Sequence, residues 1–114
     1  MIHRFLGAEA VVSALRPTDP LLLLRSHKAF DAARQALDSF PGTIAYAVKV
    51  CDRPEVLDAL ADAGISHFDV ASIYEIRAVR AQFPHATLHY MNPIKSLPHI
   101  AEAYELGVHS FAYD

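Results

Sequence analysis

The sequence predicts an α/β fold in which helices join the strands of a parallel sheet. From residue 26 onward, segments with helical apolar spacing alternate with short β-type segments. The centres of the four β-type segments, near Tyr46, Asp69, His89 and Phe111, lie 23, 20 and 22 residues apart. Each interval accommodates one strand, one helix and two loops, so consecutive strands are expected to run parallel.

Two architectures fit this alternation, an open doubly wound sheet and part of an eight-stranded β/α barrel. The four glycines stand at positions 7, 42, 64 and 107, so the chain contains no glycine-rich dinucleotide-binding loop. We expect residues 25–114 to form four β/α units. Residues 1–24 are expected to form an N-terminal arm, with a short strand at the leucines of positions 21–24.

The first half of the repeat begins with a helix over residues 26–40, which is apolar on one face and ends at Pro41 and Gly42. A strand over residues 43–50 follows. The next helix starts at Pro54, which suits a first helical turn, and ends at Gly64, which suits a C-cap. Residues 65–70 form the next predicted strand.

The second half begins with Ser72 and Glu75, whose spacing matches a capping box at the start of a helix that ends at Pro84. A strand over residues 86–91, a helix over 96–106 and a strand over 108–113 complete the series. Four strands cannot close an eight-stranded barrel. We therefore expect the chain to be an incomplete domain that is inactive alone and self-associates.

The composition indicates an ordered protein without a nucleic-acid or membrane partner. Hydrophobic residues make up 53% of the 114 residues, and the net charge of -3 includes no long run of either sign. Cys51 is the single cysteine, and the histidines lack metal-ligand spacing, so neither a disulfide nor a metal site is expected. A cytoplasmic protein that acts on a small molecule fits these features.

The strand over residues 43–50 carries the first candidate site. Alternation along a strand places Ala45, Ala47 and Lys49 on one face, where the two alanines leave room for a flat molecule. Barrel active sites lie at the C-terminal ends of strands, and a partly desolvated lysine there can form an imine with an aldehyde. The alternative is that Lys49 simply extends its amine into solvent.

Three further residues are candidates for the site. Asp69 shares the face of Lys49 if Phe68 and Val70 face the helices, although an aspartate also serves helix starts. Glu75 is explained by the capping box alone. His89 lies on a strand whose inward face the flanking residues do not determine, and a packed histidine is the expected outcome.

Several motifs together resemble the ornithine decarboxylase branch of the fold-type III pyridoxal-phosphate enzymes. The resemblance covers roughly residues 19–114 and selects the barrel, so the expected fold is the N-terminal half of a (β/α)8 TIM barrel of the alanine racemase and ornithine decarboxylase type. The motifs are Ala45-Tyr-Ala-Val-Lys49, Phe68-Asp-Val-Ala-Ser72 with Glu75-Ile76, Met91-Asn-Pro-Ile-Lys95, Gly107-Val108 and Phe111-Ala-Tyr-Asp114.

The resemblance implies that Lys49 binds pyridoxal 5'-phosphate covalently, with Ala47 and Asp69 beside the cofactor. Lys49, Asp69 and Glu75 are then the expected catalytic residues. The implied reaction is decarboxylation of a basic amino acid, most simply of ornithine to putrescine in polyamine biosynthesis, by a homodimer. The resemblance further implies that the phosphate site, the acidic partner of the pyridine nitrogen and the substrate-selecting residues lie beyond Asp114.

Related functions remain open at this stage. One is a diaminopimelate decarboxylase or an amino-acid racemase of the same fold, although Val50-Cys51-Asp52 does not match the racemase motif. The segment from Asn92 to Lys95 resembles the decarboxylases of basic amino acids more than the diaminopimelate branch. A second possibility, from a different class, is a non-catalytic homologue that binds a regulatory protein, and the presence of Lys49 and Asp69 argues against it.

Overall fold

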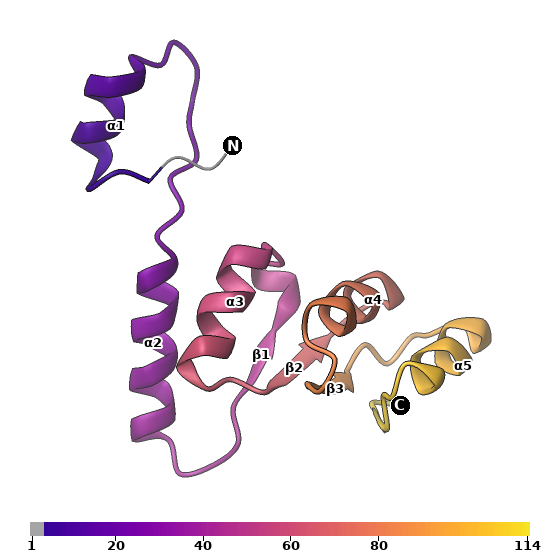
Figure 1. Cartoon of the computed structure of the whole chain (residues 1–114). Helices are drawn as coiled ribbons and strands as arrows, with labels where there is room; N and C mark the ends of the chain where they lie inside the picture. The colour runs from indigo at the N-terminus through magenta and orange to yellow at the C-terminus, as the bar shows by residue number, and fades with distance from the viewer. Residues whose placement is uncertain (1–3) are drawn as a thin grey trace.

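The computed structural model describes residues 4–114, which form helices and strands in nearly strict alternation (Figure 1). A short 3-10 helix, η1, directly follows the first strand. The elements are α1 (Ala8–Leu15), α2 (Ser26–Ser39), β1 (Ala45–Ala47), η1 (Val48–Val50), α3 (Pro54–Ala63), β2 (His67–Val70), α4 (Ile73–Gln82), β3 (Thr87–Tyr90), α5 (Leu97–Glu105) and β4 (Ser110–Phe111).

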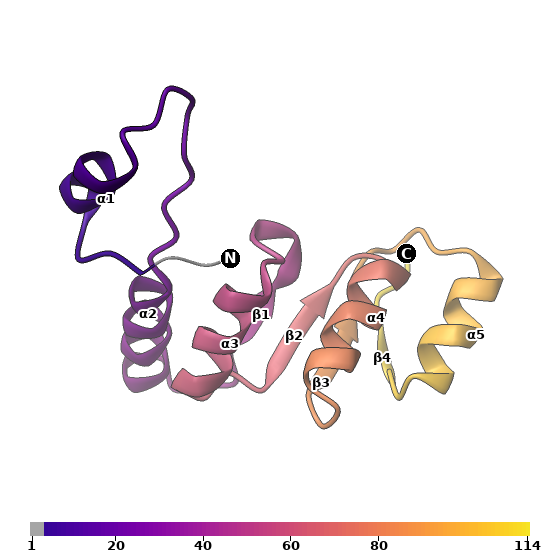
Figure 2. The ribbon, with the colours of Figure 1, turned by 45° about the horizontal axis from the view of Figure 1, so that its top comes forward.

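The four strands form one parallel sheet in the order β1-β2-β3-β4 (Figure 2). Each new strand is added beside the previous one, on the same side. A doubly wound sheet reverses this direction at a switch point, whereas a barrel does not. The order therefore confirms the prediction of a parallel α/β sheet of the barrel type, and the sheet is open in the described residues.

The two faces of the sheet differ sharply. One face packs under the helices, and its strand residues are almost fully buried, with Phe68 and Val70 at 0% exposure and Leu88 and Tyr90 at 2%. Burying this apolar surface is the main source of stability in the sheet-helix layer. The opposite face carries small and polar residues that are half-buried or exposed, and no described element covers it: Ala45, Ala47, His67, Asp69, Thr87, His89 and Ser110.

The N-terminal arm differs from the prediction. The leucines at positions 21–24 form no strand, because within the described residues they find no partner strand with which to pair, and all four are exposed. A helix that the sequence analysis missed, α1, stands apart from the sheet in Figure 1. The arm and the open sheet give a radius of gyration of 16.9 Å. A compact domain of this length would measure only about 13 Å.

The ends of the helices follow the predicted signals. Gly64 has φ 113° after α3, and Gly107 has φ 82° after α5, a left-handed conformation that glycine adopts without strain. At the start of α4 the Ser72 hydroxyl accepts a hydrogen bond from the Glu75 amide at 3.2 Å. The capping-box prediction is therefore confirmed.

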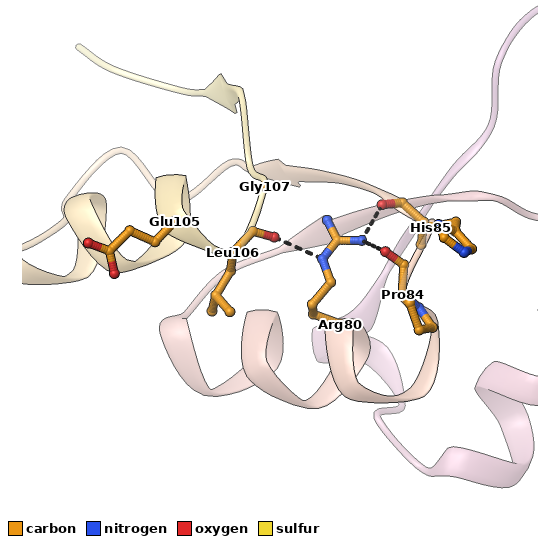
Figure 3. A pocket seen from close by; sticks show the side chains of 7 residues that line it. Arg80, Pro84, His85, Glu105, Leu106 and Gly107 are labelled. Carbon is orange, nitrogen blue, oxygen red and sulfur yellow. Dashed lines mark hydrogen bonds between the residues drawn. The ribbon is translucent and has the colours of Figure 1, made fainter.

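Arg80 ties the loops together at the N-terminal ends of the strands. From the last turn of α4 its guanidinium donates to the carbonyl oxygens of Leu106, Pro84 and Ala86, each at 2.8 Å (Figure 3). These carbonyls belong to the end of α5 and to the loop that leads into β3. One cation thus fixes the entries to β3 and β4, and it lines the shallow pocket drawn in Figure 3.

We predict that Arg80→Met destabilises the protein by about 1.5–3 kcal/mol, the usual range for lost hydrogen bonds to a charged group. The urea midpoint of the full-length protein should fall, and amide hydrogen exchange should accelerate in residues 84–88 and 106–110. Arg25→Met is the matched control, because Arg25 is exposed and its side chain makes no hydrogen bond within the described residues. Equal effects of the two substitutions would contradict the role of Arg80.

Candidate active site

Lys49 lies in η1, immediately after β1 at the C-terminal edge of the sheet. The predicted strand over residues 43–50 is too long, because β1 ends at Ala47 and a 3-10 turn replaces its last three residues. The turn breaks the two-residue alternation: Val48 is 1% exposed, whereas Val50, expected to pack under the helices, is 73% exposed. Strand alternation was therefore the wrong argument for the placement of Lys49, although the residue does follow the strand's C-terminal end.

The side chain of Lys49 is exposed and has no hydrogen bond or ion pair within the part of the chain that the structure describes. The turn that carries it is held by Tyr46, whose hydroxyl donates to the Cys51 carbonyl at 3.2 Å. Burial raises the pKa of Tyr46, and the nearby Cys51 thiol adds to this effect. Tyr46 therefore remains a protonated donor, and the Lys49 amine is available on a fixed turn.

Asp69 lies across from Ala47, its register partner on β1. Its neighbours Phe68 and Val70 are fully buried against the helices, so the alternation of β2 places Asp69 on the opposite, uncovered face. Asp69 is thus the neighbour, across the two strands, of the small residue Ala47, which precedes Lys49 by two positions in the chain. Its expected role in the site stays a prediction.

Glu75 is engaged at the start of α4. Its Oε2 accepts a hydrogen bond from the Ala71 amide at 2.7 Å, which completes the cap described above. Burial raises the pKa of Tyr90, and the carboxylate of Glu75 raises it further. The geometry of Glu75 is therefore explained by helix capping, and a role in catalysis stays a prediction.

The loop after β3 is tied to the end of the sheet by Lys95. Its Nζ donates to the carbonyl oxygens of Asn92 at 2.5 Å and Pro93 at 3.2 Å, and also to that of Ala112. The same ammonium lies 5.4 Å from the centroid of the Tyr90 ring. The two lysines at this edge therefore differ in their hydrogen bonding. The Lys95 amine donates to carbonyl oxygens, whereas the Lys49 amine has no partner within the described residues.

His89 lies on the uncovered face, in register with Asp69 on one side and Ser110 on the other. It is half-buried and lies edge to edge with His67, with ring centroids 5.3 Å apart. His89 is therefore a packed, partly buried histidine, as expected, but it lies on the face that carries Asp69, because the buried face of β3 is taken by Leu88 and Tyr90. Sequence reasoning missed the pair, which only the register of β2 and β3 could reveal.

The C-terminal end of β1 and β2 carries the kinds of group that a flat aldehyde cofactor would need. Ala45 and Ala47 are small residues on the uncovered face of β1, Asp69 is the register partner of Ala47, and the exposed Lys49 follows on the turn after β1. Within residues 4–114 no group of three or more histidine, cysteine or carboxylate side chains is placed to hold a metal ion. None of the helices in that range is long and apolar enough to span a membrane.

Comparisons with known proteins agree with this chemistry. A sequence profile for the pyridoxal-binding domain of pyridoxal-dependent decarboxylases matches residues 24–114. A search of curated protein sequences finds no match.

Two solved structures of lysine/ornithine decarboxylase from Vibrio vulnificus also resemble this chain. The complex with putrescine is 30% identical with a TM-score of 0.76, and the match covers 93% of this chain and 29% of that one. The complex with cadaverine is 28% identical with a TM-score of 0.76, and the match covers 96% and 32% respectively. The chain thus spans less than a third of the length of either relative.

We predict that Tyr46→Phe, which removes only the hydroxyl, lowers stability by about 0.5–1.5 kcal/mol and speeds hydrogen exchange at residues 49–51. A tyrosine whose pKa is raised by folding adds stability below its ordinary pKa of about 10, and this stability is lost as the pH rises through the raised value. The parent protein should therefore lose more stability above about pH 10 than Tyr46→Phe does. Tyr113→Phe, at an 89% exposed ring, should change neither measurement. Unchanged hydrogen exchange at residues 49–51 in Tyr46→Phe would show that the hydrogen bond from Tyr46 to Cys51 does not hold this turn.

Proposed function

The chain belongs to the pyridoxal-dependent decarboxylases, as their pyridoxal-binding domain, and we propose that its parent protein decarboxylates a basic amino acid with Lys49 as the cofactor lysine. One observation carries the proposal: the Lys49 amine is exposed and unpaired on the turn that follows β1, at the edge of the sheet where barrel enzymes place their sites. Bound pyridoxal phosphate supplies an electron sink for the bond that breaks.

Lys49 would provide the amine that holds the cofactor covalently. The hydrogen bond from Tyr46 to Cys51 restrains the turn, so the amine starts from a limited set of positions. The shelf of Ala45 and Ala47 would receive the flat ring without a steric clash. Lys95, the other lysine of this edge, is excluded from this role because its amine is committed to three carbonyls.

Asp69 would orient the charged nitrogen of Lys49 by a charge-assisted hydrogen bond. Its register with Ala47 brings it beside the shelf from the neighbouring strand. Glu75 would act from the start of α4, where one oxygen is already held by the Ala71 amide. It would contribute negative charge near the site and would not move during turnover.

We propose ornithine as the substrate and putrescine as the product, with lysine as the nearest competitor. The support is the segment from Asn92 to Lys95, which resembles the decarboxylases of basic amino acids, and the likeness to lysine/ornithine decarboxylase at 30% identity. A cytoplasmic homodimer in polyamine biosynthesis belongs to the same proposal. Steady-state decarboxylation of ornithine, lysine, arginine and diaminopimelate by the full-length protein tests the substrate, and a preference for diaminopimelate would contradict it.

We predict that borohydride reduction of the full-length protein with pyridoxal phosphate places the pyridoxyl group on Lys49, as read by peptide mass mapping. Lys49→Ala should lose both the label and the decarboxylase activity, because no other described lysine at this edge has a free amine. Lys28→Ala, on the exposed surface of α2, is the control and should retain both. A label on Lys28 or Lys95 would overturn the assignment.

We predict that Asp69→Asn weakens binding of pyridoxal phosphate about tenfold, which corresponds to the loss of one charge-assisted hydrogen bond. The substitution keeps the shape of the side chain and removes its charge, so stability should change little. Absorbance titration of the cofactor-free protein measures the dissociation constant. Asp62→Asn, exposed on α3, provides the matched control. An unchanged constant for Asp69→Asn would remove this residue from the site.

A further inference from the structure

His67 and His89 form a hydrogen-bonded imidazole pair on the uncovered face of the sheet. Nδ1 of His67 lies 3.0 Å from Nε2 of His89, and the two rings are nearly parallel, at 13°. The rings come from neighbouring strands and sit two residues apart in register, since His67 pairs with Thr87 and His89 pairs with Asp69. The pair therefore links two successive layers of this face.

The two nitrogens in contact restrict where the protons of neutral rings can lie. A neutral imidazole carries one N–H and one bare nitrogen, so one ring must donate and the other accept. If His89 donates, both rings carry their proton on Nε2. If His67 donates, both rings carry it on Nδ1. The two arrangements differ at Nδ1 of His89, which is its only ring nitrogen left for another partner.

Asp69 favours the second arrangement. It is the register partner of His89 and lies two residues from His67 on the same face of β2. Its carboxylate makes no hydrogen bond within the described residues, so it is still able to accept one from His89. A carboxylate beside a bare imidazole nitrogen is repelled, whereas beside an N–H it accepts a charge-assisted hydrogen bond. Thr87 and Ser110, the other side chains in register with the pair, are neutral and do not oppose this preference.

We propose that His67 and His89 are positioning residues of the cofactor site, in which His67 donates to His89 and His89 in turn presents its Nδ1–H to Asp69. The pair thereby orients the carboxylate that faces the cofactor lysine. The link to cofactor binding rests on the proposed function, whereas the proton arrangement of the pair does not. Such outer partners commonly determine how well a site residue performs.

The proton arrangement can be measured directly in the cofactor-free, full-length protein labelled with 15N at histidine. At about pH 8.5, where imidazoles are neutral, long-range 1H–15N spectra report which nitrogen carries the proton. We expect the Nδ1–H form for both His67 and His89, assigned by the loss of each signal in its asparagine variant. His27, exposed on α2, provides the reference for a free ring. The Nε2–H form at both positions would overturn the proposal.

Two variants of His89 test the effect on the site. The amide nitrogen of asparagine takes the place of Nδ1, whereas that of glutamine takes the place of Nε2. We expect His89→Gln to weaken pyridoxal phosphate binding about tenfold and His89→Asn to stay within about threefold of the parent protein. Equal losses in both variants, or none, would contradict a positioning role. If the parent protein itself fails to bind pyridoxal phosphate, the proposed function fails, while the spectra still decide the arrangement of the pair.

Discussion

The in-register pairing of parallel strands is the constraint on which the rest of the molecule depends. It aligns Ala47, Asp69, His89 and Ser110 in one row across the sheet, although more than 60 residues separate the first from the last. A shift of one residue in any strand would exchange its buried and uncovered faces. Phe68 and Val70 resist such a shift, because exposing them would forfeit a large share of the core. The apolar face therefore determines which polar residues meet on the other.

The turn after β1 adds what a regular strand could not provide. If β1 continued to Val50, Val50 would pack under the helices and the chain would leave the sheet later. The 3-10 turn instead ends the strand early and keeps Val48 as the last buried anchor before the exposed Lys49. The single hydrogen bond from Tyr46 to the Cys51 carbonyl closes this short segment. Regular elements on both sides thus support an exposed lysine on an irregular piece of backbone.

Local signals predicted helices α2 to α5 well, whereas they missed α1 and gave less of the geometry of the candidate site. Proline, glycine and the pair Ser72 and Glu75 mark helix ends through interactions within a few residues, so they can be recognised in the sequence. No local pattern reveals whether a segment has a partner strand with which to pair. The sequence therefore could not show that residues 48–50 and the leucines at positions 21–24 form no strand. The contact between His67 and His89 depends on the register of two strands joined by a helix. The face of β2 on which Asp69 lies could be predicted, because its two buried neighbours determine it, whereas its role in the site stays a prediction.

Different groups of side chains lie at the N-terminal and the C-terminal ends of the strands. Arg80 joins the loops at the N-terminal edge, whereas Lys49, Asp69 and the loop held by Lys95 lie at the C-terminal edge. The hydrogen bonds of Arg80 and the proposed site therefore lie on different loops, at opposite ends of the strands. For protein engineering, this separation means that the stability of the fold can first be raised by substitutions around Arg80. The stability gained there can then offset the cost of substitutions at the opposite ends of the strands.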